Sequence, residues 1–147
     1  APWSNSTYDG KTLLIQDLTN ASIASVALSN QYAGNCAYEP TWDAIYLLSN
    51  SLNELGLTWR NNSVKVIIMF TDEEGQSYEY APPLVLQEVV DMAVQENRHV
   101  YIFTVSNVYY SYKPIADATD GGMYNLYLSQ PEMESVLDSI VSEETCK

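Results

Sequence analysis

The side chains that could do chemistry in this chain are almost all oxygen donors. The 147 residues include 19 aspartates and glutamates, but only one histidine, His99, and two cysteines, Cys36 and Cys146. This inventory leaves no His/Cys zinc site, no Cys–His nucleophile pair and no disulfide-rich miniprotein scaffold. We also find no glycine-rich phosphate loop, and therefore expect no enzymatic activity. Carboxylates and hydroxyls are the ligands that hard cations need, so the inventory favours cation binding.

The charge balance excludes several partners. Six lysines and arginines against 19 acids give a formal net charge of −13, which repels nucleic acid phosphates and anionic lipid headgroups. We expect no nucleic acid partner. The longest apolar stretch lies around residues 66–71, far short of the ~20 apolar residues that a membrane helix needs. We therefore expect no membrane span, and the length is that of one domain.

Three Asn-x-Ser/Thr triplets indicate a secreted or cell-surface protein, with glycan acceptors at Asn5, Asn20 and Asn61. The 12 tyrosines and few lysines agree with this expectation. No charged segment followed by an apolar one opens the sequence, so any signal peptide would already have been removed and Ala1 would be a processed end.

Other polar residues have plain structural interpretations. Asp43, Glu73 and Glu74 are expected to be solvated acids, with Asp43 favoured by a helix macrodipole. His99 is expected in an exposed turn. Several tyrosines gather in two loops and suit a protein interface or a carbohydrate platform, or else only cover sheet edges; they are Tyr78, Tyr80, Tyr109, Tyr110 and Tyr112.

The elements that must position these residues alternate along the chain. After an extended segment, residues 1–10, the run at 11–18 predicts a strand and residues 22–31 a helix. Apolar residues at helical spacing predict a helix over 42–55, with Gly56 as its C-cap. The apolar β-branched run at 64–70 predicts a strand buried on both faces, in the middle of a parallel sheet.

The second half continues the alternation. Pro83 opens a predicted helix over 83–96, and residues 99–105 form the next buried strand. A short helix at PIADAT, a strand at 123–127 and a helix over 131–143 follow. The predicted fold class is therefore α/β, with a mostly parallel twisted sheet, adjacent strands at 64–70, 99–105 and 123–127, and helices on both faces.

Three stretches together resemble the von Willebrand factor A family, and within it the I-like domain of integrin β subunits and bacterial relatives. They are the loop and helix GNCAYEPTWDAIYLL, the strand and loop VKVIIMFTDEEG, and the tail HVYIFTV followed by PIADATDGGMYNL. The resemblance covers roughly Lys11 to Val141 and implies a three-layer, Rossmann-like fold. We accordingly treat residues 11–147 as a partial domain of this type.

The family's first metal motif, Asp-x-Ser-x-Ser, is absent. Only 22 positions separate Asp17 from Glu39, which is too few for a first helix and two strands. The alignment therefore makes residues 11–18 the third strand, so that this chain begins partway through the domain. We expect a second chain, or the cleaved N-terminal half of a precursor, to complete the sheet.

The resemblance also implies a cation site. Glu39 falls on the acidic ligand of the family's Gly-Asn loop, Thr41 is an alternative oxygen donor, and Asp72 falls on the aspartate that ends the fourth strand. The family holds Mg²⁺ there, and Mn²⁺ or Ca²⁺ could replace it. One coordination position is left for an acidic residue of a protein partner. Glu39 and Asp72 should then lie within one coordination shell.

Both cysteines are expected to be oxidised. In the family's arrangement Cys36 lies near the metal end and Cys146 at the opposite end, whereas a disulfide needs Cα atoms ~4.4–6.8 Å apart. Cysteines in the absent segment are therefore preferred over a Cys36–Cys146 bridge. Two functions follow from the sequence: an extracellular adhesion or binding module with a divalent cation, or a structural subunit of an assembly with a degenerate metal site.

Overall fold

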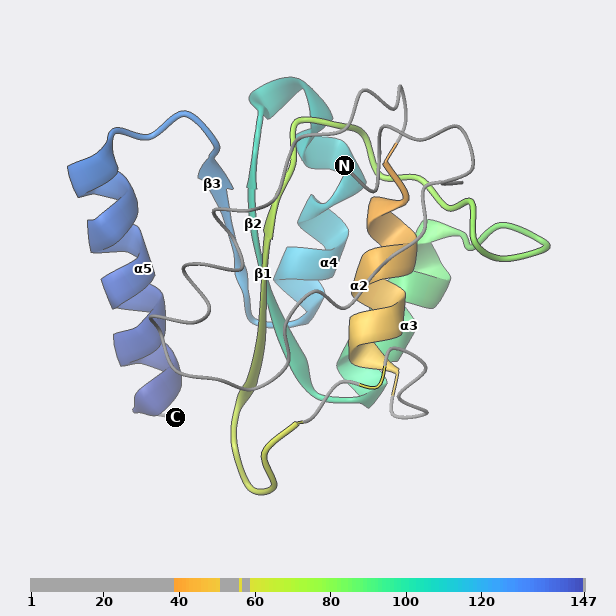
Figure 1. The fold of residues 1–147 in the computed structure, drawn as a ribbon, viewed down its shortest axis with the longest axis horizontal. Helices are drawn as coiled ribbons and strands as arrows, with labels where there is room; N and C mark the ends of the chain where they lie inside the picture. Colours follow the sequence, from red (N-terminus) through yellow and green to blue (C-terminus); the bar gives the residue numbers. More distant parts are fainter. Residues whose placement is uncertain (1–38, 51–55, 57–58, 147) are drawn as a thin grey trace.

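The computed structural model describes residues 39–50, 56 and 59–146. Helix α2 spans Thr41–Ser49, α3 spans Leu86–Gln95, α4 spans Lys113–Ala118 and α5 spans Gln130–Thr145. Strands β1, β2 and β3 span Lys65–Phe70, Arg98–Thr104 and Gly122–Asn125, and the 3₁₀ helix η2 spans Ser106–Ser111. Strands and helices alternate, and the described part of the chain is therefore an α/β structure (Figure 1).

The three strands form one parallel sheet in the order β1-β2-β3. Lys65 is opposite Arg98 and Phe70 is opposite Phe103, so β1 is paired along its whole length. Tyr101 is opposite Gly122 in the second ladder. All three strands therefore end at the same edge of the sheet, where their following loops meet.

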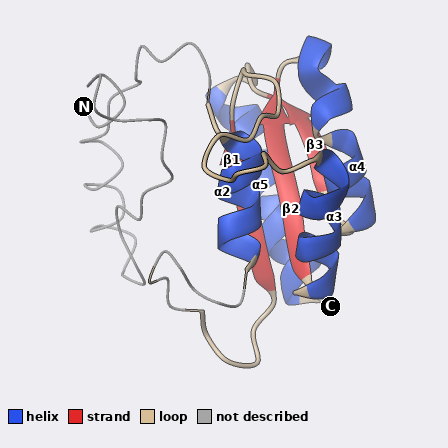
Figure 2. Ribbon diagram, turned by 90° about the vertical axis from the view of Figure 1, so that its right-hand side faces the viewer, coloured by secondary structure: helices blue, strands red, loops and turns tan. Residues whose placement is uncertain are grey.

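Side chains of β2 alternate between two cores because successive residues of a strand point to opposite faces. Val100 and Ile102 pack with Ile45 and Ile115 in the core shared with α2, α3 and α4. Tyr101 and Phe103 pack with Ile140 of α5 on the other face. Figure 2 shows the helices flanking the sheet from both sides.

Local sequence signals explain where the long helices begin. Ser129 caps α5: its Oγ accepts from the Glu132 backbone N–H at 3.4 Å, and the Glu132 carboxylate accepts from the Ser129 N–H at 2.8 Å. Helix α3 starts after Val85, whose N–H donates to the Glu88 carboxylate at 2.8 Å. In both helices, a glutamate at the third helical position therefore caps the N-terminus.

The predicted adjacent parallel strands and the alternating helices are confirmed, with some shifted boundaries. The helix predicted over 42–55 ends at Ser49, because Asn50 is extended with ψ at 125°. Gly56, at φ 69°, is therefore not the C-cap of that helix. The helix predicted from residue 83 begins at Leu86, where Glu88 supplies its cap.

The prediction that residues 64–70 form a central strand buried on both faces is wrong for the described sheet. Strand β2 is central, and β1 is an edge of the sheet that the described residues form. Ile67 is buried, but Ile68 is 38% and Phe70 is 52% exposed. The α5 face of β1 is left partly uncovered: the cluster under α5 is built on Tyr101 and Phe103 of β2, and Val66 is the β1 residue that packs against it.

The elements predicted at 11–18 and 22–31, and the segment 1–10, lie outside the described residues. Within the part of the chain that the structure describes, no helix is long and apolar enough to cross a membrane.

Candidate functional site

The candidate site lies at the carboxyl ends of β1 and β2. Thr71, the first residue after β1, continues the ladder by donating its N–H to the Phe103 carbonyl at 3.1 Å. The loop that follows crosses the start of α2, where the Trp42 N–H donates to the Gln76 carbonyl at 3.1 Å. Backbone hydrogen bonds thus bring the β1 loop and the residues around Glu39 to the same edge.

The buried hydroxyl of Thr71 joins these two segments. It donates to Glu39 Oε2 at 3.1 Å and accepts from the Glu73 N–H at 3.1 Å. Sequence analysis placed Asp72 at the site and missed the role of Thr71. The Thr-Asp pair after a buried strand was the available signal, since a hydroxyl at that position can bridge a loop to its neighbour.

Glu39 is held among like charges. Burial around its carboxyl group raises the pKa of Glu39, the hydrogen bond from Thr71 lowers it, and the charges of Asp72 and Glu73 raise it further. Glu39 and Asp72 therefore interact electrostatically at one edge of the sheet, and both residues are exposed. That the two share a coordination shell stays a prediction.

Thr41 is buried and its hydroxyl is 2.8 Å from the Tyr112 hydroxyl. Tyr112 donates to the Glu73 carbonyl at 2.7 Å, so the Thr41 hydroxyl is the donor in the first contact. Burial raises the pKa of Tyr112 to about 12, against the hydrogen bond from Thr41 that lowers it. Thr41 thus connects α2 to the loop after β1 through Tyr112. That Thr41 is a metal ligand stays a prediction.

The tyrosines of the two loops do not form one uniform surface. Tyr112 is fully buried, while Tyr78 is 47% and Tyr110 is 61% exposed. Tyr80 packs edge-on against Tyr46 of α2, with ring centroids 5.3 Å apart. Only part of the predicted tyrosine cluster is therefore available to a partner.

Asp43 is not the solvated acid that the sequence suggested. It is fully buried and accepts a short hydrogen bond from the Ser77 hydroxyl. It also accepts from the N–H groups of Tyr78 and Glu79 at 2.6 and 2.8 Å. The loop after β1 supplies these donors, and their hydrogen bonds offset the free-energy cost of burying the carboxylate.

Trp42 and Gly75 pack the same loop onto α2. The Trp42 indole N–H donates to the Ser111 carbonyl at 3.3 Å. A Cβ added to Gly75 would lie 2.0 Å from the indole nitrogen. Position 75 requires glycine because the loop backbone lies directly against the Trp42 ring. Movement of the loop away from α2 would break this packing.

The described residues do not make a metal centre by themselves. No three His, Cys, Asp or Glu side chains among them converge closely enough to hold an ion. What they offer is an oxygen-rich edge: the carboxylates of Glu39 and Asp72 beside the Thr71 hydroxyl. Further ligands would have to come from elsewhere to complete a cation site.

The remaining predicted site residues are dispersed. Asn61 is exposed in the turn before β1, where its side chain is accessible. Cys146 is an exposed free thiol after α5, so its oxidation stays a prediction. Asn5, Asn20 and Cys36 lie outside the described residues.

His99 differs from the sequence expectation. It lies within strand β2, its side chain is 14% exposed, and it pairs with Glu144 of α5. The contact joins residues 45 positions apart, so no local pattern could have indicated it.

The chain matches no protein-family model and none of the curated proteins. The resemblance to the von Willebrand factor A family therefore depends on the three sequence stretches and on their order.

Proposed function

We propose that this chain is part of an extracellular, non-enzymatic adhesion or protein-binding module of the von Willebrand factor A type. Its cation site would be formed in part by Glu39 and Asp72 and completed by another segment or chain. When bound, Mg²⁺, Mn²⁺ or Ca²⁺ supplies positive charge and an open coordination position for an acidic residue of the partner. The three glycan acceptor triplets favour an extracellular setting, and the net charge of −13 favours cation binding.

The observation that carries the proposal is the electrostatic interaction of Glu39 with Asp72 at the carboxyl edge of a parallel sheet. Ligands of open α/β sheets bind at this edge, where loops from several strands meet. The charge of Asp72 raises the pKa of Glu39, so the two acids repel one another in the absence of a counter-charge. A divalent cation removes that repulsion.

The open side of β1 supports the second part of the proposal, a completing segment. Among the described residues β1 is paired only with β2, while Val64, Ile68 and Phe70 remain exposed. Edge strands with exposed apolar residues are templates for further strand pairing. A strand added beside β1 would extend the sheet toward the larger three-layer fold and would bring its own loop to the carboxyl edge.

Calorimetry with Mg²⁺, Mn²⁺ and Ca²⁺ on the intact protein, with its sheet complete, tests the proposal. We expect saturable binding of at least one cation, weakened at least about tenfold by Asp72→Asn, because a carboxylate ligand is lost. The exposed Asp117→Asn variant is the control: Asp117 pairs only with Lys113 on α4, at 2.6 Å.

Absence of binding by all three cations would refute the cation site and favour the structural alternative. In that case the fold serves as a subunit of a surface or extracellular assembly, and partner binding is unchanged by chelators. Equal loss of binding in Asp72→Asn and Asp117→Asn would show that general charge, rather than this site, attracts the cation.

A further inference from the structure

Two side chains of helix α5 are buried, Ile140 and Glu144. Partly buried apolar residues of the same helix also pack on this face of the sheet: Met133, Val136 and Leu137. Ile140 packs into the apolar core with Tyr101 and Phe103. Glu144 is polar, and it lies in the last turn of the helix, 6% exposed. The C-terminal turn of α5 is therefore held to the sheet by a buried carboxylate rather than by apolar packing.

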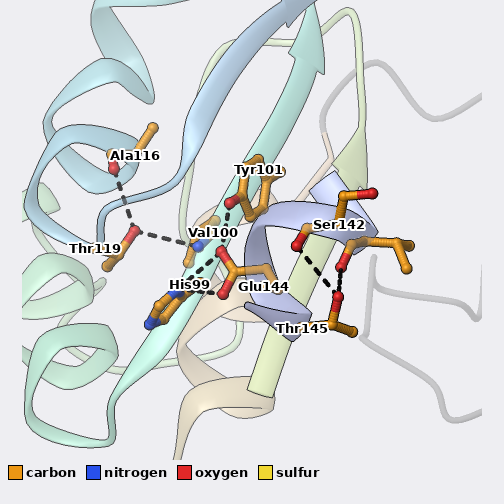
Figure 3. A network of polar contacts seen from close by, with 9 residues as sticks. His99, Val100, Tyr101, Ala116, Thr119, Ser142, Glu144 and Thr145 are labelled. Carbon is orange, nitrogen blue, oxygen red and sulfur yellow. Dashed lines mark hydrogen bonds and ion pairs between the residues drawn. The ribbon is translucent and has the colours of Figure 1, made fainter. Parts of the chain in front are cut away.

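Strand β2 provides the partners of this carboxylate, as Figure 3 shows. His99 Nδ1 is 2.9 Å from Glu144 Oε1 and 2.8 Å from Oε2. The Tyr101 hydroxyl donates a short hydrogen bond to the same Oε1. Because an ionised carboxylate can only accept, His99 donates through Nδ1. Two residues of one strand thus hold one residue of the helix.

The sequence of α5 provides little stabilisation for its C-terminal turn. Helix α5 contains five acids and no lysine or arginine, namely Glu132, Glu134, Asp138, Glu143 and Glu144. The last two lie at the C-terminal turn, where the partial negative charge of the macrodipole repels them. Thr145 closes the turn by donating to the Val141 carbonyl at 2.8 Å. A protonated His99 brings a positive charge against Glu144.

The tyrosines near Glu144 do not change charge near neutral pH, whereas histidine is the type of side chain that does. Burial, the hydrogen bond to Glu144 and the nearby charges of Glu144 and Glu143 raise the pKa of Tyr101 well above its ordinary value, so Tyr101 remains a neutral donor. Tyr124 of β3 also faces the cluster, and its pKa is raised by burial and by Glu143. Histidine is the side chain that gains a proton between about pH 8 and pH 5, and His99 is the only histidine of the chain.

We propose that His99 and Glu144 form a pH-sensitive latch, which holds the C-terminal turn of α5 to β2 more tightly as the pH falls from about 8 to about 5.5. Protonation converts a neutral hydrogen bond into a charge-assisted one within a buried site. Charge-assisted hydrogen bonds are roughly twice as strong as neutral ones. The sign follows from the charge: the stabilisation is present when His99 is protonated and is lost as the pH rises.

Hydrogen exchange of the intact protein tests the latch, with protection factors corrected for the intrinsic pH dependence of exchange. We expect the peptide that covers residues 136–146 to be about three- to tenfold more protected at pH 5.5 than at pH 8, the difference between a charged and a neutral hydrogen bond. Strand residues 98–104 serve as the internal reference for folding in the same measurement.

His99→Asn is the decisive variant, because its amide N–H keeps a neutral donor near the position of Nδ1 but cannot gain a charge. We expect it to retain the protection seen at pH 8 and to lose the increase at pH 5.5. Glu144→Gln should behave likewise. Asp138→Asn, on the same helix, is the matched control and should keep the wild-type response.

Two outcomes would overturn the proposal. One is equal protection of residues 136–146 at both pH values in the wild type. The other is a wild-type pH response in His99→Asn, which would assign the effect to the general charge of the acidic helix. Loss of protection in the reference strand of a variant identifies global unfolding, and Glu144→Gln then provides the test through the opposite partner.

Discussion

The carboxyl group of Glu39 lies in an electrostatically unfavourable place. It accepts a hydrogen bond from Thr71, but burial and the charges of Asp72 and Glu73 together raise its pKa. A carboxyl group whose pKa is raised in the folded state lowers the stability of the protein once the pH exceeds its ordinary pKa, because the unfolded chain ionises more readily. The ionised form of Glu39 therefore lowers the stability of the folded protein at neutral pH.

We predict that Glu39→Gln stabilises the cation-free protein at pH 7 and weakens cation binding. The amide oxygen can still accept from Thr71, while the repulsion from Asp72 and Glu73 disappears. Chemical denaturation in a chelator measures the first effect and calorimetry the second. At pH 3.5 the gain in stability should vanish, since Glu39 is then largely protonated in both the folded and the unfolded chain. A destabilised variant at pH 7 would contradict this account of Glu39.

Asp43 is the opposite case, a carboxylate fully satisfied by donors. Three donors converge on it, from Ser77, Tyr78 and Glu79. An amide at this position would turn its own N–H₂ group toward at least one of these donors. The residue is therefore structural, and it fixes the loop that carries Asp72 to the edge of the sheet.

We predict that Asp43→Asn lowers the free energy of unfolding by about 3 kcal/mol, the range expected when a buried charged hydrogen-bond acceptor is lost. Urea denaturation at pH 7 measures the effect. Asp117→Asn serves as the control and should change stability by at most about 0.5 kcal/mol, since its pair with Lys113 is exposed. Equal effects in both variants would show that Asp43 does not anchor the loop.

Among the elements, β2 organises the described fold, because both cores and both ladders include it. Its Val100 N–H donates to the Thr119 hydroxyl at 3.2 Å, which ties it to the end of α4. Figure 3 includes this contact. The turn from α4 to β3 then passes directly over the Val100 carbonyl, and the approach leaves no room for a side chain at Gly121.

We predict that Gly121→Ala destabilises the protein by at least about 3 kcal/mol, because backbone atoms must shift to relieve the overlap. A Cβ at that position would lie 1.8 Å from the Val100 carbonyl oxygen. At the neighbouring Gly122 the nearest atom is 3.1 Å away, on the side chain of Tyr124. Gly122→Ala should therefore have the smaller effect, and thermal unfolding of the two variants compares them. A reversed order would contradict the close approach of this turn.

At the scale of the whole molecule, the side of β1 that pairs with no other described strand is the surface most prone to association. Ile68 and Phe70 are exposed on the face that carries α5, and Phe70 stacks on Phe103 with centroids 4.7 Å apart. An apolar edge of this kind favours association with another strand. The proposed completing segment would cover it.

We predict that residues 1–147, expressed alone, self-associate, and that Ile68→Lys reduces this association by placing a charge on the open edge strand. Size-exclusion chromatography with light scattering measures both. Val94→Lys, at a similarly exposed position on α3, is the matched control and should not change the association state. A soluble wild-type monomer that unfolds cooperatively would refute the need for a completing segment.

The sequence alone was sufficient for the parallel α/β arrangement of the described residues. Residues 65–70 and 98–104 are largely apolar runs, and the helix between them has apolar residues at helical spacing. These patterns are local, because burial on a face imposes a period of about 2 or 3.6 on the chain. The types of site residue could also be inferred, since an acidic chain with one histidine offers mainly oxygen ligands.

Tertiary structure alone decided what each polar residue does. Asp43 and Asp72 look alike in sequence, yet one is fully buried and the other exposed. The pairing of His99 with Glu144 and of Thr41 with Tyr112 joins residues 45 and 71 positions apart. Burial, charge and hydrogen bonding at such positions depend on which distant segments pack together. No periodicity in the sequence encodes that packing, so the roles of these residues became visible only in the folded chain.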